Sequence, residues 1–155
     1  MKIIQKFIIC IIILSLAIFP DIKASAEVVY SFNEDLIYCT TVIEEIPIST
    51  YSSYSTSKTK TGSKTVYYKD ANGNTLWYVK VTATFSYNGN TSICKSASVT
   101  AVSCNSNWKV SNKSSSYSGN HGTASATGKK YLAGVVTSTI NKSVTLTCSK
   151  NGTLS

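Results

Sequence analysis

TLWYVKVTATFSYNG, residues 75 to 89, is the stretch that decides the fold. Every second residue from Trp77 to Tyr87 is apolar, and the residues between them from Lys80 to Ser86 are polar. Neighbouring side chains on a strand point to opposite faces of a sheet, so the pattern predicts a strand with one buried and one wetted face. Asn88-Gly89 then supplies the positive-φ pair that a tight hairpin favours. The stretch therefore predicts an antiparallel β protein.

Further strand patterns lie on both sides of this stretch. Strands are predicted at 64–69, 91–104, 108–116 and 123–136, the last with a break at Gly128 or Gly134, and one more near the C-terminus. In the C-terminal strand the apolar residues share one face: Ile140, Val144, Leu146 and Cys148. Short strands separated by turns roughly every eight to twelve residues predict an all-β antiparallel sandwich, immunoglobulin-like or a small-barrel variant.

The register of segment 91–104 has two solutions. A two-residue loop before it places Cys94 on the apolar face. A three-residue loop with a bulge instead places its aliphatic residues there: Ile93, Ala97, Val99 and Ala101. Because a buried cystine behaves as core, the sequence leaves both registers open.

The N-terminus has the features of a secretion signal. Lys2 and Lys6 precede the apolar run 8–19, and Ala24-Ser25-Ala26 offers the small residues that a signal peptidase reads. We expect cleavage after Ala26 and a secreted or cell-surface location. The predicted organisation is a signal peptide at 1–26, an acidic segment and Ser/Thr/Tyr-rich tether at 27–61, and a β-sandwich domain at 62–155. The acidic segment is either a pro-region or an N-terminal strand.

Four cysteines remain after cleavage, and an even number in an exported chain predicts two disulfides. The spacing of Cys94, Trp108 and Cys148 resembles that of immunoglobulin domains, in which a disulfide between the sheets packs on a tryptophan. The resemblance favours a Cys94–Cys148 link, with Cys39–Cys104 tying down the acidic segment. No metal site is predicted, because the cysteines are not clustered and His121 is the sole histidine.

Residues 62–155 also resemble a group of small exported β-proteins of Gram-positive bacteria. The shared elements are a tryptophan-bearing strand that ends in aromatic-Tyr-Asn-Gly, a following cysteine, a Ser/Asn-rich tryptophan segment and a C-terminal Thr-Leu-Thr-Cys. In this chain they are Trp77 to Gly89, Cys94, Ser106 to Trp108, and Thr145 to Cys148. The resemblance implies export and β structure, and no particular activity.

Charge is strongly segregated along the chain. All fifteen basic residues are lysines; residues 27–57 carry five carboxylates and no lysine, and residues 58–155 carry twelve lysines against Asp70 alone. A basic domain of this kind attracts polyanions. For an exported protein these are cell-wall polymers, acidic glycans or anionic lipid headgroups. Nucleic acid is not predicted as a partner, because arginine, which is best suited to phosphate and guanine contacts, is absent.

The chain offers little for catalysis, and we predict no catalytic residue and no cofactor. A glycosidase needs paired carboxylates and would have to recruit Glu44 or Glu45 to join Asp70. A Ser-His-Asp arrangement would have to use His121 with Asp70, and both are more simply explained as turn residues.

Binding is the better prediction. Lys64, Lys69, Lys80, Lys129 and Lys130 are predicted to attract an anionic cell-wall polymer or glycan, and Tyr68 and Tyr78 to stack on it from the same outer face as Lys80. The alternative is a secreted membrane-active or antimicrobial β-protein. Its support is that Ser/Thr-rich alternating strands resemble those of pore formers, and that lysines attract anionic membrane surfaces.

Overall fold

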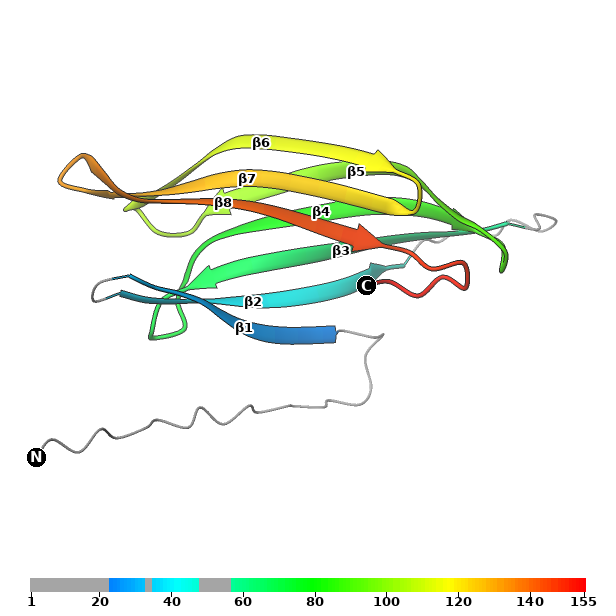
Figure 1. Ribbon diagram of the computed structural model, residues 1–155, viewed down its shortest axis with the longest axis horizontal. Coiled ribbons are helices and arrows are strands. Elements are labelled where there is room, and N and C mark those ends of the chain that lie inside the picture. The colour runs from blue at the N-terminus through cyan, green and yellow to red at the C-terminus, as the bar shows by residue number, and fades with distance from the viewer. Residues whose placement is uncertain (1–22, 33–34, 48–56) are drawn as a thin grey trace, which may run out of the picture.

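The computed structural model describes residues 23–32, 35–47 and 57–155, which form two antiparallel sheets packed face to face, without helices in these ranges (Figure 1). The strands are β1 (Lys23–Phe32), β2 (Asp35–Ile46), β3 (Lys58–Lys69), β4 (Thr75–Tyr87), β5 (Ser92–Ser103), β6 (Trp108–Ser118), β7 (His121–Leu132) and β8 (Val135–Thr147). One sheet has the order β1-β2-β3-β4-β5 and the other β6-β7-β8. The predicted all-β class with antiparallel sheets is confirmed.

Each sheet is a meander, since within it each strand pairs with its neighbour in the chain, and the chain passes from one sheet to the other between β5 and β6. Immunoglobulin domains use Greek-key connections instead. The Cys-Trp-Cys spacing also fails to assemble as it does in that fold, because Trp108 lies beside Trp77 with ring centroids 6.2 Å apart, whereas Cys94 lies near Gly122 at the other end of β7. The immunoglobulin-like arrangement is therefore not the one that forms.

The buried face of β4 is the centre of the core, as its alternation predicts. Four of its side chains are 0% exposed: Trp77, Val79, Val81 and Phe85. Across from them β7 presents small buried residues: Gly122, Ala124, Ala126 and Gly128. The predicted apolar face of β8 is also confirmed, with Val144, Leu146 and Cys148 buried and Ile140 half-buried. Large side chains of one sheet thus fill the space above small ones of the other.

The tightest contact in this core is between Trp77 and Gly128. A Cβ on Gly128 would overlap Cε2 of the Trp77 indole, so only glycine lets the two sheets approach this closely. On its other side the indole stacks on Tyr68, with centroids 4.3 Å apart and an angle of 4° between the ring planes. Gly128 therefore lies within a strand, and the predicted break falls at Gly134 in the turn between β7 and β8.

The register of β5 combines the two predicted solutions. Cys94 pairs with Phe85, and Ala97 pairs with Ala83, so both lie on the core face. This is possible because the register shifts between these pairs, which leaves Lys95 as the extra residue of a β-bulge. Ile93 alone departs from its predicted face, since it pairs with Ser86 and is exposed.

The acidic segment forms part of the larger sheet, so the sandwich begins N-terminal to residue 62. β2 pairs with β3 from Tyr38 to Ile46, and β1 pairs with β2. The end of the predicted tether, from Lys58 onward, forms the start of β3. Residues 48–56 of the tether lie outside the described residues, and so do residues 1–22 of the predicted signal peptide. Residues 23–26, before the predicted cleavage point, pair with 40–43 of β2.

All four cysteines of the described chain are thiols, so the predicted disulfides are not present. The Cys39–Cys104 pairing is wrong on geometric grounds. Cys39 pairs with Tyr68, which pairs with Trp77, which pairs with Ser103, so Cys39 lies three strands from Cys104. That is about 14 Å, twice the Cα separation a disulfide can span. Cys94 and Cys148 lie at one end of the sandwich, where their N–H groups donate to Gly119 and Asn120 respectively.

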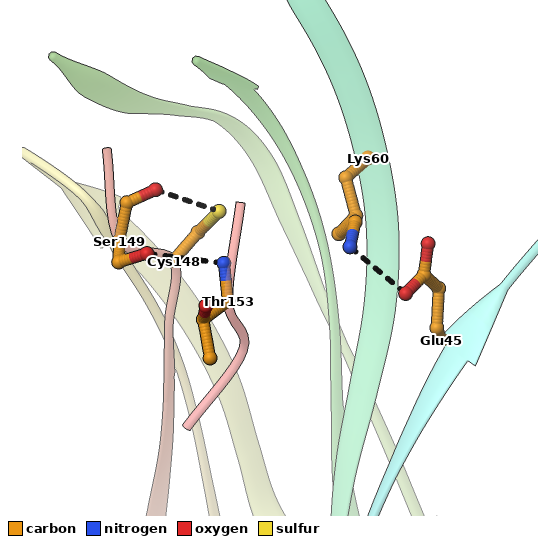
Figure 2. Close-up of polar contacts among 5 residues, drawn as sticks. All are labelled: Glu45, Lys60, Cys148, Ser149 and Thr153. Atoms are coloured by element: carbon orange, nitrogen blue, oxygen red, sulfur yellow. Dashed lines mark hydrogen bonds and ion pairs between the residues drawn. The ribbon is translucent and has the colours of Figure 1, made fainter. Parts of the chain in front are cut away.

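The three-stranded sheet covers only part of its partner. β7 packs on β4 and β5, and β8 on β3 and β4, while β1 and β2 have no strand of the other sheet against them in the described structure. After β8 the chain turns at Ser149, whose Oγ accepts the N–H of Thr153 at 3.0 Å (Figure 2). Ser155 then pairs with Thr147, and Leu154 packs on Gly62 of β3. This C-terminal turn closes the sandwich beside β8.

Candidate functional site

The predicted binding residues do not form one face. Tyr68 is 1% exposed and stacked in the core, so its predicted role in stacking on a ligand is wrong. Lys64 pairs with Val81 on the inward-facing side of β3. Lys80 lies on the outer face of the five-stranded sheet, whereas Lys129 lies on the outer face of the three-stranded sheet. The predicted continuous basic face is therefore wrong.

The outer face of the five-stranded sheet carries an aromatic pair. Tyr67 of β3 pairs with Tyr78 of β4, and their ring centroids are 5.5 Å apart at an angle of 45°. Both rings are half-buried. Lys69 Nζ lies 6.0 Å from the Tyr67 centroid, over the ring, and Lys80 follows Tyr78 on the same face of β4. We call these four residues, Tyr67, Lys69, Tyr78 and Lys80, the tyrosine platform.

The charge of the platform is partly balanced. Lys80 Nζ lies 3.9 Å from Glu44 Oε2 of β2, and Ser63 donates a hydrogen bond to the same carboxylate oxygen at 3.4 Å. A separation of 3.9 Å between partly exposed groups gives a weak ion pair. Lys80 is therefore able to turn toward an anionic ligand at little cost.

Lys129 and Lys130 lie near the end of β7 and belong to a second basic group. Lys129 pairs with Lys109 of β6, and Lys109 Nζ lies 5.0 Å from the Tyr131 centroid. Because Trp77 contacts Gly128, this group lies at the same end of the sandwich as Tyr78 but over the opposite sheet. The two basic groups are thus separate surfaces.

A small cleft of about 170 Å³ lies between β2, β3 and the C-terminal turn. Its lining residues are Ile43, Glu45, Lys60, Asn151, Gly152, Thr153 and Leu154. Figure 2 shows Lys60 reaching from β3 to Glu45 on β2, with Nζ 2.9 Å from Oε2. Partial burial alone would lower the pKa of Lys60, but the hydrogen bond and charge of Glu45 outweigh it and the pKa is raised. The cleft therefore holds a satisfied ion pair.

The candidate catalytic residues are not brought together. Asp70 lies in the turn before β4, where it accepts hydrogen bonds from Asn72 and Asn74, and His121 begins β7 at the opposite end. The six residue steps of strand from Trp77 to Ala83, which separate the two ends, span about 20 Å. Glu44 and Glu45 are consecutive on β2 and so face opposite sides of the sheet. Within the described ranges no group of three His, Cys, Asp or Glu residues is placed to hold a metal ion.

Tyr67 is a site residue that the sequence does not predict, since it is Tyr67 that lies on the outer face, and not Tyr68. The cause is a register shift next to the turn: Lys69 pairs with Thr75, but Tyr68 pairs with Trp77, so Leu76 is an extra residue. If the two strands had paired residue by residue from Lys69 and Thr75 without a shift, Tyr67 would have paired with Trp77. The one available signal was the alternation of KTVYYK, in which Val66 and Tyr68 share a face.

The part of the chain that the structure describes contains no helix long and apolar enough to cross a membrane. Comparisons of the chain with protein-family models, with curated proteins and with solved structures gave no match.

Proposed function

We propose that this protein is a non-catalytic binding module of the cell envelope or extracellular space, which engages an anionic polymer or glycan through the tyrosine platform. The observation that carries the proposal is the Tyr67–Tyr78 pair on the outer face of a sheet, next to two lysines. Tyrosine rings stack on the apolar faces of sugars at little entropic cost. Ammonium groups beside them pair with the carboxylates or phosphates of the same chain.

Other features support binding over catalysis. Acid–base chemistry needs ionisable groups held together in one site, and Asp70 and His121 lie at opposite ends of the strands. The absence of arginine from the sequence favours acidic glycans over nucleic acid, and no cofactor is invoked. Export is inferred from the N-terminal sequence pattern.

The first test measures binding to polygalacturonate, a uronic acid polymer, with neutral dextran as the comparison. Replacing Tyr67 or Tyr78 by alanine should weaken binding about tenfold, since losing one stacking contact costs roughly 1.4 kcal/mol. Tyr117→Ala is the matched control, because Tyr117 is 56% exposed on β6 of the other sheet. Equal losses in all three variants would show that the platform is not the site.

The electrostatic part is tested with Lys69→Gln and Lys80→Gln. Each should weaken binding to polygalacturonate, and raising the salt from 0.1 M to 1 M should do the same, because the screening length falls from about 10 Å to about 3 Å. Lys113→Gln, in the exposed part of β6, should have no effect. A flat salt response, or equal binding to dextran, contradicts the proposal.

A further inference from the structure

The turn between β7 and β8 exposes apolar side chains. Leu132 and Val135 are each 65% exposed and Val136 is 43% exposed. Leu132 and Val135 form the last pair of the two strands, so Ala133 and Gly134 make a two-residue turn between them. Figure 1 shows this turn at one end of the molecule, beyond the turns between β3 and β4 and between β5 and β6. We call residues 132–136 the apolar tip.

The composition of this turn is unusual for the chain. The other described hairpin turns are polar: DANGN at 70–74, NGNT at 88–91 and GN at 119–120. In the apolar tip Ala133 has φ +49° and Gly134 φ +82°. Asparagine tolerates the first of these conformations far better than alanine does. The sequence thus keeps this turn apolar at a conformational cost.

Lysines surround the base of the apolar tip. Lys129 and Lys130 precede it on β7, and Lys109 lies directly opposite Lys129 on β6. Like charges placed opposite each other in a sheet repel and destabilise it. No carboxylate side chain follows Asp70 anywhere in the sequence, so every charged side chain of the three-stranded sheet is a lysine, apart from any charge on His121. We call Lys109, Lys129 and Lys130 the basic collar.

We propose that the apolar tip and basic collar form a docking surface for an anionic lipid bilayer. Leu132, Val135 and Val136 enter the boundary between headgroups and acyl chains, and the collar binds the phosphates above it. Tyr131 lies between tip and collar, the level at which aromatic rings gather in membrane interfaces. An apolar surface ringed by charge of one sign matches this layered chemistry, in which burial of apolar groups and attraction to anionic lipid act together.

The docking is tested by flotation of the full chain with vesicles of phosphatidylcholine alone or mixed with phosphatidylglycerol. Binding should require phosphatidylglycerol. Each of Lys109→Gln, Lys129→Gln and Lys130→Gln should weaken it about fivefold. Leu132→Ser should weaken it on the order of tenfold or more. Ile93→Ser is the matched control, because Ile93 is 48% exposed at the other end of the sandwich, and it should bind as the wild type does.

Insertion itself is tested with Leu132→Trp. Trp77 and Trp108 are both buried, so a change in emission on binding reports the new tryptophan. Its fluorescence should shift to the blue and be quenched by lipids with brominated acyl chains, whereas Ile93→Trp should show neither effect. Ala133→Asn should weaken binding severalfold with an unchanged or higher unfolding midpoint, which separates the surface from the stability of the turn.

Three results would overturn the proposal. The first is equal binding, or none, with both kinds of vesicle. The second is an unshifted and unquenched Leu132→Trp in a variant that still floats with phosphatidylglycerol, since the tip then stays in water. The third is a loss in Ile93→Ser equal to that in Leu132→Ser, since the apolar contact then lies elsewhere. None of these readouts involves the tyrosine platform, so Tyr67→Ala should leave vesicle binding intact.

Discussion

The two sheets contribute opposite kinds of surface to the same interface. β4 of the five-stranded sheet brings the fully buried Trp77, whereas β7 of the three-stranded sheet meets it with Gly128. The large side chains of β4 are buried because the facing strand, β7, carries only glycine and alanine on its inner face from Gly122 to Gly128. Close packing of this kind makes each sheet dependent on the other, since neither inner face can be buried alone.

The sheets differ in charge as well. The described carboxylates of the five-stranded sheet include Glu44 and Glu45, each within 4 Å of a lysine. The three-stranded sheet, from Trp108 to Thr147, has five lysines and no carboxylate side chain. The three-stranded sheet is therefore positive along its length, whereas the charge of the other sheet is partly neutralised by Glu44 and Glu45.

The largest expected effect comes from joining the two sheets. Cys94 belongs to β5 and Cys148 follows β8, and their backbone N–H groups donate to the consecutive residues Gly119 and Asn120. Oxidised glutathione should take two electrons and two protons from this pair and link the sulfurs. Closing a loop of some fifty residues should raise the free energy of unfolding by about 4 kcal/mol, measured by urea denaturation.

Peptide mapping without reduction checks the pairing, and Cys94→Ser is the control that should gain nothing from the oxidant. Burial raises the pKa of the Cys94 thiol, and Cys148 adds to the rise, so the reaction should speed up as the pH is raised above neutral. In the native protein iodoacetamide should label exposed Cys104 first, with buried Cys39 protected. A linked Cys39–Cys104 peptide would contradict the strand order described here.

The next largest effect concerns Gly128, on the inner face of β7. Gly128→Ala should lower the free energy of unfolding by about 3 kcal/mol, the upper part of the usual range for overpacking. The new methyl group would clash with the Trp77 indole, and the indole has no room to move away because Tyr68 stacks on its other face. Urea denaturation measures the loss.

A double-mutant cycle separates this clash from a general effect of alanine. Trp77→Phe removes the outer part of the indole, so adding Gly128→Ala to it should cost less than it does in the wild type. Additive losses in the cycle would mean that the two residues do not press on each other.

The core could be predicted because its signal is local. Alternation in β4 and β8 names the buried residues without knowledge of the partner strand. β7 gave a weaker signal, because glycine and alanine at Gly122, Ala124 and Gly128 are buried by what faces them and not by their own hydrophobicity. Its role in the core became visible only with the other sheet in place.

The candidate sites could be predicted only in part, because they depend on register. One extra residue at Leu76 exchanged the faces of Tyr67 and Tyr68, and one at Lys95 brought both Cys94 and Ala97 to the core. A bulge depends on pairing across the sheet, which a single strand pattern does not encode. The Cys39–Cys104 prediction failed for a related reason, since spacing in sequence says nothing about the number of strands between two residues.

The smallest expected effect is the contribution of Asp70 to stability in the polar turn before β4, which contrasts with the apolar tip. The Asn74 side chain donates a hydrogen bond to Asp70, and the backbone N–H groups of Asn74, Asn72 and Gly73 add to it, so the pKa of Asp70 lies below its ordinary value. A carboxyl with a lowered pKa in the folded state contributes stability above its unfolded pKa and loses it as the pH falls through the folded value.

Wild-type stability should therefore decline slightly more than that of Asp70→Asn as the pH drops below about 4. Urea midpoints at pH 6 and pH 3 measure the difference, and Asn74→Ala, which removes the strongest donor, should halve it or more. If the three proteins respond alike to acid, the turn is held by its backbone alone and the carboxylate of Asp70 is dispensable.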